Sequence, residues 1–280
     1  MSPARPKILG IVNLTEDSFS DGGRYLDPRA ALAHARALAA AGADILDLGA
    51  AASNVDAKPV AIDEEIRRLE PLMSVLSADG VPVSVDSFRT EVQRFAIGRG
   101  VAYLNDIQGF PDPAFYPELA AARCRLIVMH AVHGRGRAQE LDLSAALVWQ
   151  RVNAFFDERV TALERAGIAR ERIVIDPGMG LFLSSRPEAS LRILNGLGDL
   201  KRRFGLPVLV SVSRKSFLRA LAGHSSPTEL AAATLAAELH AAREGADYIR
   251  THDPGALADG LKITAALAAA GRPEKIPEPA

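Results

Sequence analysis

Residues 8–23, Ile-Leu-Gly-Ile-Val-Asn-Leu-Thr-Glu-Asp-Ser-Phe-Ser-Asp-Gly-Gly, pass from an apolar, β-rich run into hydroxyl groups, acids and glycines, with Asn13 at the junction. A buried strand that ends in a polar, glycine-rich loop places such a side chain within reach of a ligand. Taken alone, the stretch is equally typical of a core strand followed by a solvated turn. Whether the same pattern recurs along the chain therefore distinguishes a ligand-binding strand end from an ordinary turn.

Similar short apolar runs recur and alternate with helical stretches. The runs are continuous Val, Ile and Leu, which is typical of strands covered on both faces in a parallel sheet. After the first strand we expect strands at residues 45–48, 81–85, 101–104, 125–129, 173–175, 208–212 and 248–249. We expect helices at residues 27–41, 62–76, 89–97, 113–122, 144–166, 187–203 and 255–269, and two helical pieces broken near 223–227. Eight such units predict an α/β fold, a single-domain TIM (β/α)8 barrel, with a doubly wound open sheet as the alternative.

Length and composition fit one large domain. No linker divides the 280 residues, so we expect a barrel over residues 1–270 and a flexible tail at 271–280. The net charge of -1, without a long run of one sign, argues against nucleic acid or a membrane as partner. The single cysteine, Cys124, excludes an intramolecular disulfide and fits a reducing compartment. We find no signal peptide and expect a cytoplasmic protein.

Polar side chains follow the predicted strands, at the end of a barrel where active sites form. They are Asn13; Asp47 and Gly49; Ser84, Asp86 and Ser87; Asn105 and Asp106; Met129 and His130; residues 176–180; Ser211 and residues 213–215; and residues 250–253. Each has a structural alternative. Asp86 and Asp106 are also typical helix N-caps, His130 and His252 also suit a hydrogen-bonded place in the core, and Asp176-Pro-Gly also suits a turn. The coincidence of so many strand ends favours a binding site.

The chemistry of these side chains divides into two sets. Asp86, Asn105 and Asp176 offer carboxylates and an amide, which pair with the parallel N–H donors of an amino-substituted ring. A second set suits an anion such as phosphate or pyrophosphate: Asn13, Lys215, Arg250 and His252. No His/Cys cluster has zinc spacing, and no glycine-rich dinucleotide or P-loop motif follows a strand. The ligand is therefore expected to combine a polar heterocycle with phosphate.

Seven motifs, in this order, resemble those of dihydropteroate synthase. They are residues 13–23, Val85-Asp86-Ser87, Leu104-Asn105-Asp106-Ile107, Met129-His130, Asp176-Pro-Gly-Met-Gly180, Ser213-Arg214-Lys215 and Arg250-Thr251-His252. The resemblance runs from about residue 8 to the last helix. The first motif and Ser-Arg-Lys are highly specific, whereas Met-His alone would mean little.

The resemblance implies a TIM-barrel transferase of folate biosynthesis, usually a homodimer, whose partners are small-molecule substrates. Its reaction joins 4-aminobenzoate to 6-hydroxymethyl-7,8-dihydropterin pyrophosphate, giving 7,8-dihydropteroate and pyrophosphate. The implied pterin-binding residues are Asp86, Asn105, Met129, Asp176 and Lys215. Those for pyrophosphate are Asn13, Arg250 and His252, with Asn13 acting through a Mg²⁺ cofactor. Those for aminobenzoate are Thr15, Phe19, Ser53, Phe182, Ser213 and Arg214. We expect Lys215, Asp86 and Arg250 to be catalytic.

Two loops depart from the family pattern. Gly-Gly-Glu-Ser-Thr-Arg-Pro-Gly would be usual after the second strand, but residues 50–56 read Ala-Ala-Ala-Ser-Asn-Val-Asp, with Ser53 in the place of the Thr. Leu-Phe-Leu-Ser-Ser, residues 181–185, replaces the usual Phe-Gly-Lys. Both changes resemble the sulfonamide-insensitive synthases of mobile resistance elements. A bulkier wall, Phe182 or Phe217, would exclude a tetrahedral sulfonyl group and admit a planar carboxylate. The alternative is that both loops have drifted.

Two other functions use the same pterin-binding set. A pterin-binding methyltransferase barrel shares the Asp, Asn and Asp positions, but the Ser-Arg-Lys motif and residues 13–23 favour the synthase. A catalytically inactive pterin binder is the other alternative, because the second loop is altered. Turnover separates it from an enzyme.

Overall fold

The strands form a barrel. The computed structural model describes residues 5–15, 27–51, 59–132, 141–224 and 226–270. Within these ranges eight parallel strands form one sheet in the order β6-β5-β4-β3-β2-β1-β8-β7. Their bounds are β1 Lys7–Asn13, β2 Ile45–Gly49, β3 Val83–Asp86, β4 Tyr103–Asp106, β5 Arg125–Met129, β6 Ile173–Asp176, β7 Leu209–Val210 and β8 Tyr248–Thr251.

Pairing at both ends of the chain closes the sheet. Leu9 in β1 is the register partner of Ile45 in β2 on one side and of Arg250 in β8 on the other. The remaining gap, between β6 and β7, is joined by the isolated parallel bridge Ile175↔Val208. A doubly wound open sheet has two free edges and does not pair its first strand with its last. The predicted single-domain TIM barrel is therefore confirmed.

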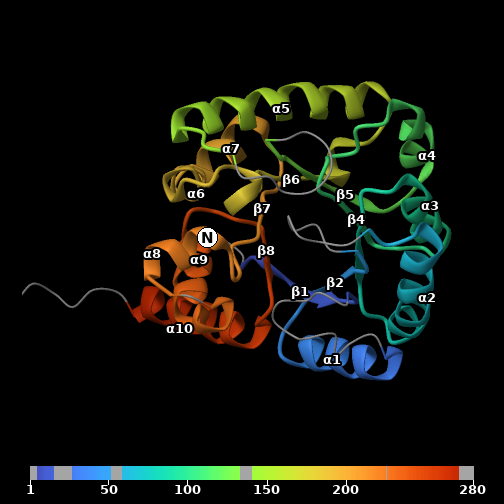
Figure 1. Ribbon diagram of the computed structural model, residues 1–280, viewed down its shortest axis with the longest axis horizontal. Coiled ribbons are helices and arrows are strands. Elements are labelled where there is room, and N and C mark those ends of the chain that lie inside the picture. Colours follow the sequence, from blue (N-terminus) through green and yellow to red (C-terminus); the bar gives the residue numbers. More distant parts are fainter. Residues whose placement is uncertain (1–4, 16–26, 52–58, 133–140, 225, 271–280) are drawn as a thin grey trace, which may run out of the picture.

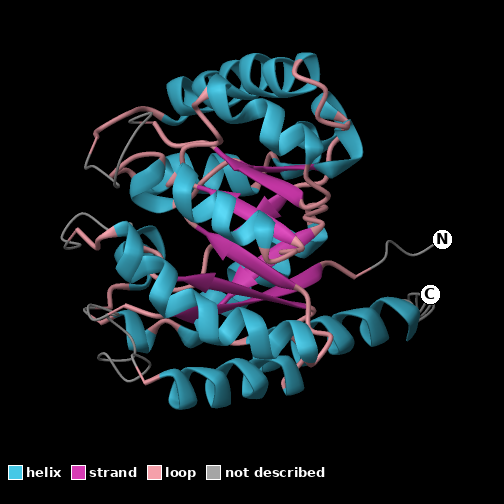
Figure 2. Cartoon of the chain, turned by 90° about the vertical axis from the view of Figure 1, so that its right-hand side faces the viewer, coloured by secondary structure: helices cyan, strands magenta, loops and turns pink. Residues whose placement is uncertain are grey.

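Helices surround the barrel, as Figure 1 shows in a view into the ring and Figure 2 shows from the side. Their bounds are α1 Pro28–Ala40, α2 Ile62–Ala78, α3 Thr90–Gly98, α4 Tyr116–Ala121, α5 Ala145–Arg165, α6 Pro187–Leu194, α7 Leu197–Phe204, α8 Ser216–Ala222, α9 Ala231–Arg243 and α10 Pro254–Ala270. Short 3-10 turns lie at η1 Pro113–Phe115, η2 Arg170–Arg172, η3 Gly180–Phe182 and η4 Pro227–Glu229. None of the helices in the described ranges combines the length and apolar character that crossing a bilayer requires.

The inside of the barrel changes from apolar to polar along the strands. One buried apolar layer takes a side chain from every strand except β3: Leu9, Ile45, Tyr103, Ile127, Val174, Leu209 and Tyr248. Residues two positions apart on a strand point to the same side of the sheet. The next inward positions therefore belong to Asp47 after Ile45, Asn105 after Tyr103, Asp176 after Val174 and Arg250 after Tyr248. This polar layer lies towards the carboxyl ends of the strands.

Two predicted elements were wrong in extent. The helix expected at 187–203 is two helices, α6 and α7, because Gly196 breaks it. A Cβ atom at Gly196 would lie 2.5 Å from Cζ3 of Trp149 in α5, so the ring of Trp149 needs a glycine there. The strand expected at 208–212 keeps only two residues, Leu209–Val210. Beyond them the chain leaves the sheet for a turn at Arg214, whose φ is 58°. The predicted tail at 271–280 lies outside the described residues.

Candidate active site

A buried ion-pair cluster joins β2, β3 and β8 inside the barrel. Arg250 donates from Nε to Oδ2 of Asp47 at 2.5 Å and from Nη2 to Oδ2 of Asp86 at 2.7 Å. Asn105 of β4 also donates to Oδ2 of Asp47, at 3.5 Å. The Arg250 side chain is 16% exposed, and that of Asp47 is fully buried. Breaking such a pair leaves a buried charge uncompensated, so these contacts fix the direction of the guanidinium.

Asp47 is the residue whose importance the sequence analysis missed. It was noted at a strand end but given no role, whereas the structure places it between Arg250 and Asn105. The available signal was an acid inside the otherwise apolar strand Ile-Leu-Asp-Leu-Gly. A fully buried acid requires a cation or several donors, and this requirement predicts a partner from elsewhere in the barrel.

Three buried oxygen atoms of this cluster have no hydrogen-bond partner among the described residues: Asp47 Oδ1, Ser84 Oγ and Asn105 Oδ1. They come from the neighbouring strands β2, β3 and β4, and Ser84 of β3 is the register partner of Asp47 of β2. Leaving such a group unpaired costs about 1–3 kcal/mol. The free acceptors therefore provide a place for the N–H groups of a ligand.

Burial moves the pKa values of Asp86, Asp176 and Lys215 towards neutrality. It raises the pKa of Asp86 to about 7, although the positive charge of Arg250 lowers that pKa. It raises the pKa of Asp176 to about 6, although Oδ1 of Asp176 accepts from the backbone N–H of Gly178 at 2.8 Å. It lowers the pKa of Lys215 to about 8, with help from Arg250. Titratable groups shifted in this way are typical of a functional site.

The ends of β7 and β8 are joined by a serine and a histidine. Ser213 Oγ lies 2.9 Å from Nδ1 of His252 and accepts from the backbone N–H of the same residue at 3.3 Å. Burial and the charges of Arg214 and Arg250 lower the pKa of His252 well below its usual value. Ser213, predicted for the aminobenzoate, thus lies against a residue predicted for the pyrophosphate.

A small apolar cluster lies beside the lysine. Met129 and Phe182 belong to it together with Ile107 and Ala131. The ring centroid of Phe182 lies 5.1 Å from Nζ of Lys215, which is within the range of a cation–π contact. The predicted pterin residue Met129 and the predicted aminobenzoate residue Phe182 are therefore neighbours.

Replacing Gly178 by alanine is expected to lower the free energy of unfolding by about 3 kcal/mol. Its φ is +74°, and a Cβ atom there would lie 2.5 Å from the carbonyl oxygen of His130, so backbone strain and a clash add together. Gly80→Ala is the matched control, because its φ is +71° but its Cβ meets nothing within 4 Å. We expect about 1 kcal/mol for the control by urea denaturation. Equal losses in the two variants would contradict the clash.

Of the other predicted site residues, three lie at or beyond strand ends and two lie outside the described residues. Asn13 ends β1, Thr15 is buried just beyond it, and Arg214 donates its backbone N–H to Oγ1 of Thr234 at 3.2 Å. Phe19 and Ser53 lie outside the described residues. Asp86 is not a helix cap, because Arg89 holds the N-cap position of α3.

The structural alternative for His130 was the better interpretation, whereas the helix N-cap considered for Asp106 was wrong, because Asp112 holds the N-cap position of the next helical turn, η1. His130 is buried, with Nδ1 3.2 Å from the carbonyl oxygen of Pro177 and its ring against Phe155. Asp106 accepts from the backbone N–H groups of Gln108 and Phe110, as a turn requires. Both residues stabilise the loops around the site.

The side chain of Asn13 offers an oxygen donor of the kind that Mg²⁺ takes in proteins. In the described ranges no group of three or more His, Cys, Asp or Glu side chains forms a metal cage. A Cβ atom on Gly49 would lie 3.8 Å from Oδ1 of Asn13, so the amide oxygen of Asn13 borders this glycine. Mg²⁺ usually takes one or two protein oxygens and completes its shell with water and substrate phosphate. The donors present agree with that pattern.

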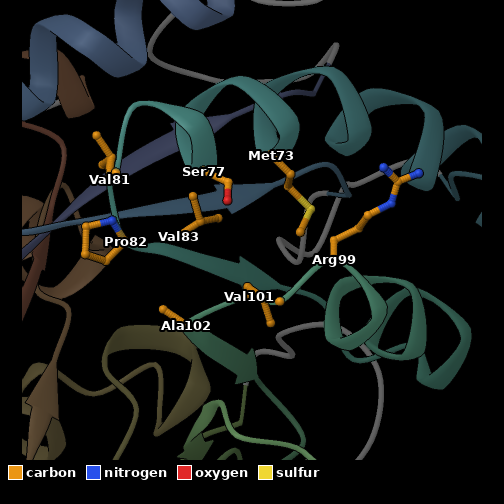
Figure 3. Close-up of a pocket in the computed structure, with 10 residues that line it drawn as sticks. Met73, Ser77, Val81, Pro82, Val83, Arg99, Val101 and Ala102 are labelled. Carbon is orange, nitrogen blue, oxygen red and sulfur yellow. The ribbon is translucent and has the colours of Figure 1, made fainter.

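Two hollows mark opposite ends of the barrel. One, of about 260 Å³, lies where β3 and β4 begin, between the last turns of α2 and α3 (Figure 3). Its floor is apolar, Arg99 at its rim pairs with Glu70, and no predicted site residue lines it. The other, of about 290 Å³, adjoins Phe182 and Lys215 in the chain and is lined by Leu181, Ser185, Ser216, Arg219, Ala220 and His224. The second hollow therefore lies at the carboxyl-end side of the barrel, but no predicted site residue lines it either.

Comparisons with known proteins agree with this geometry. A family model described as "Pterin binding enzyme" matches residues 9–252. Dihydropteroate synthase type-2 of Escherichia coli is 58% identical over 260 residues, which cover 93% of this chain and 95% of that protein. The structure of Xanthomonas albilineans dihydropteroate synthase with 4-aminobenzoic acid has a TM-score of 0.84 and 37% identity, covering 95% of this chain and 94% of that one. The same enzyme in complex with 7,8-dihydropteroate has a TM-score of 0.81 and 36% identity, covering 96% of each chain.

Proposed function

The chain belongs to the dihydropteroate synthase family, and from this premise we propose a role for each inward-facing side chain of its barrel. As a transferase of folate biosynthesis it joins 4-aminobenzoate to 6-hydroxymethyl-7,8-dihydropterin pyrophosphate, giving 7,8-dihydropteroate and pyrophosphate. The observation that carries the proposal is the meeting of Asp86, Asn105 and Arg250 in one buried cluster that still has free acceptor atoms.

The pterin ring binds to the polar layer at the carboxyl ends of β3 to β6. Asp176 accepts the two parallel N–H donors of the amino-substituted ring, because a carboxylate has two oxygen atoms in that geometry. Asn105 Oδ1, which has no protein partner in the described ranges, accepts a further N–H. Asp86 and Lys215 hold other edges of the ring, and Met129 packs near it.

The pyrophosphate binds at the ends of β1 and β8. Arg250 and His252 donate hydrogen bonds to its oxygen atoms, and Asn13 would hold Mg²⁺. When bound, the ion would supply positive charge near the leaving oxygen atoms. The guanidinium of Arg250 is already held in place by Asp47 and Asp86, so it needs little reorganisation when charge develops.

The reaction exchanges one bond for another at the pterin methylene carbon. The C–O bond to pyrophosphate breaks with its electron pair, the aromatic amine forms the C–N bond, and the amine then loses a proton. The amine is neutral and nucleophilic near pH 7, so no strong base is required. The electron-rich pterin shares the positive charge that develops on the methylene carbon, and neighbouring carboxylates such as Asp86 stabilise it. Positioning and electrostatics therefore contribute more than acid–base catalysis.

We propose that the aminobenzoate contacts Thr15, Phe182 and Arg214; its other predicted contacts, Phe19 and Ser53, lie outside the described residues. We propose that this chain is insensitive to sulfonamides because the wall at Phe182 rejects a sulfonyl group and its substituent. The place of Phe182 beside Lys215 supports this proposal, since the ring borders the predicted pterin site. Drifted loops remain the alternative.

The homodimer and the cytoplasmic location stay predictions. Exposed apolar side chains on α8 and α10 support a self-association surface: Leu221 is 54%, Ile263 62% and Leu267 70% exposed. Large apolar side chains that are this exposed are typical of an interface when they share one face. The single buried cysteine is compatible with a reducing compartment.

Pyrophosphate release tests the function directly. The purified protein would be assayed with the pterin pyrophosphate, 4-aminobenzoate and Mg²⁺, with and without excess sulfamethoxazole. We expect release that persists at drug levels far above the aminobenzoate level. Absence of release would favour an inactive pterin binder, and release blocked by low drug would favour an ordinary synthase with drifted loops. Methyl transfer to a corrinoid would favour the methyltransferase barrel.

Pterin affinity is expected to be highest between about pH 7 and 8, with a loss of up to about tenfold per pH unit outside that window. The carboxylate of Asp86 is lost as the pH falls through its raised pKa of about 7, and the charge of Lys215 is lost as the pH rises through its lowered pKa of about 8. This affinity is measured by calorimetric titration with a dihydropterin that lacks the pyrophosphate. Ionisation of the ligand's phosphate groups then does not contribute to the pH profile. A constant affinity from about pH 6 to 9 would contradict these assignments.

A further inference from the structure

The contacts of Ser213 restrict where its single hydroxyl proton can point. Ser213 is 5% exposed, and its Oγ accepts from the backbone N–H of His252 at 3.3 Å. The other contact of Oγ is Nδ1 of His252 at 2.9 Å. Within the described residues the hydroxyl proton therefore has Nδ1 as its one available acceptor. A proton on Nδ1 would occupy the same line and leave the buried hydroxyl group without an acceptor, which is costly.

The surroundings of His252 favour a ring with one proton. Burial disfavours a charged imidazolium, and the nearby cations Arg214, Arg250 and Lys215 disfavour it further. A neutral imidazole carries its proton on one nitrogen and accepts on the other. Since Nδ1 accepts from Ser213, the proton is on Nε2. Within the described residues Nε2 has no hydrogen-bond partner, so its N–H is available to a ligand.

The position of Ser213 is fixed by the turn that follows β7. Arg214 adopts a left-handed conformation, with φ 58°, and its backbone N–H donates to Oγ1 of Thr234 on α9 at 3.2 Å. The backbone N–H of Lys215 closes the turn on the carbonyl oxygen of Val212 at 3.1 Å. A side chain other than Gly, Asn or Asp in this conformation is uncommon and is held by its surroundings. The turn therefore presents the hydroxyl group to His252 rather than to solvent.

We propose that Ser213 is a positioning residue that fixes His252 as a neutral N–H donor to the pyrophosphate. The part that concerns pyrophosphate rests on the proposed function, whereas the state of the ring does not. His252 then stabilises the leaving group by a hydrogen bond from Nε2 and transfers no proton to it. Ser213 acts through the histidine and does not hold the aminobenzoate.

The state of the ring is measured by NMR on protein labelled with ¹⁵N-histidine. His252 is assigned from the signal that disappears in His252→Gln. In the unmodified protein we expect the pattern of an Nε2–H, Nδ1-acceptor ring, which differs from the patterns of the other tautomer and of the imidazolium. In Ser213→Ala we expect a mixture of tautomers. Ser77→Ala is the control, because Ser77 lies on α2 at the opposite end of the barrel from His252.

Pyrophosphate affinity is measured on the same three proteins by calorimetry with Mg²⁺ present. Ser213→Ala is expected to weaken binding about 5- to 20-fold, and Ser77→Ala to leave it unchanged. The affinity for 4-aminobenzoate, measured with pyrophosphate and a dihydropterin present, is expected to change less than about twofold in Ser213→Ala.

The outcomes separate the inference from the proposed function. An Nδ1–H ring in the unmodified protein, or an unchanged ring in Ser213→Ala, overturns the role of Ser213. A changed ring with unchanged pyrophosphate affinity supports Ser213 as the residue that fixes His252 and overturns the assignment of His252 to pyrophosphate. A loss confined to 4-aminobenzoate overturns the inference in favour of direct substrate contact.

Discussion

Replacing Lys215 by methionine is expected to lower kcat/KM for the pterin pyrophosphate by about 10³-fold. Among the described residues, the cations that act on Asp86 and Asp176 are Arg250 and Lys215, and Arg250 also pairs with Asp47. Without the lysine, three carboxyl groups share one guanidinium, and the site must then accept an anionic substrate. Methionine keeps most of the apolar stem, so the loss reports the charge and its hydrogen bonds rather than an empty space.

Lys262→Met is the matched control for this change. Lys262 lies on α10 in an exposed i,i+3 pair with Asp259, which contributes little to stability. We expect unchanged kinetics for Lys262→Met and unchanged thermal unfolding for both variants. A fall of less than about tenfold in kcat/KM for a well-folded Lys215→Met would contradict the electrostatic role of this lysine.

The barrel followed from local signals, whereas some element boundaries did not. Alternation of continuous apolar runs with helical stretches fixes the eight units, because each strand must be covered on both faces. The break between α6 and α7 depends instead on Trp149, which is 47 residues before Gly196 and fills the space beside it. The short β7 depends on the turn at Arg214. Contacts of this kind are not visible in a local pattern.

The candidate site was predicted in composition but not in pairing. The sequence places Asp86, Asn105 and Arg250 at strand ends, and the barrel brings them together. It does not show that Arg250 contacts Asp47, which lies 203 positions away in the sequence. Only the three-dimensional register of the inward layer brings these two side chains together. For the same reason the sequence does not show that Ser213, predicted for the aminobenzoate, lies against the histidine predicted for the pyrophosphate. The residue types therefore indicate the kind of ligand, whereas the fold determines which side chains contact each other.

Replacing Phe182 by alanine is expected to strengthen inhibition by sulfamethoxazole by about 10- to 100-fold while KM for 4-aminobenzoate changes less than about threefold. The ring is 7% exposed and packs with Met129 beside Lys215, so it forms a wall at the predicted boundary between the two substrates. A planar carboxylate clears such a wall more easily than a tetrahedral sulfonyl group with a bulky substituent. Removal of the ring therefore removes the steric barrier to the drug, whereas the binding of the substrate changes little.

Two further variants decide whether Phe182 itself is the wall. Phe182→Leu keeps an apolar side chain and is expected to give an intermediate inhibition constant, with less loss of stability than alanine causes at a buried position. Phe217→Ala tests the other candidate; Phe217 is 3% exposed and packs in the main core, so we expect lower thermal stability without drug sensitivity. If the inhibition constant falls in Phe217→Ala and not in Phe182→Ala, the wall is on α8. If it falls in neither, discrimination does not depend on either ring, because a steric barrier must weaken when the group that forms it is removed.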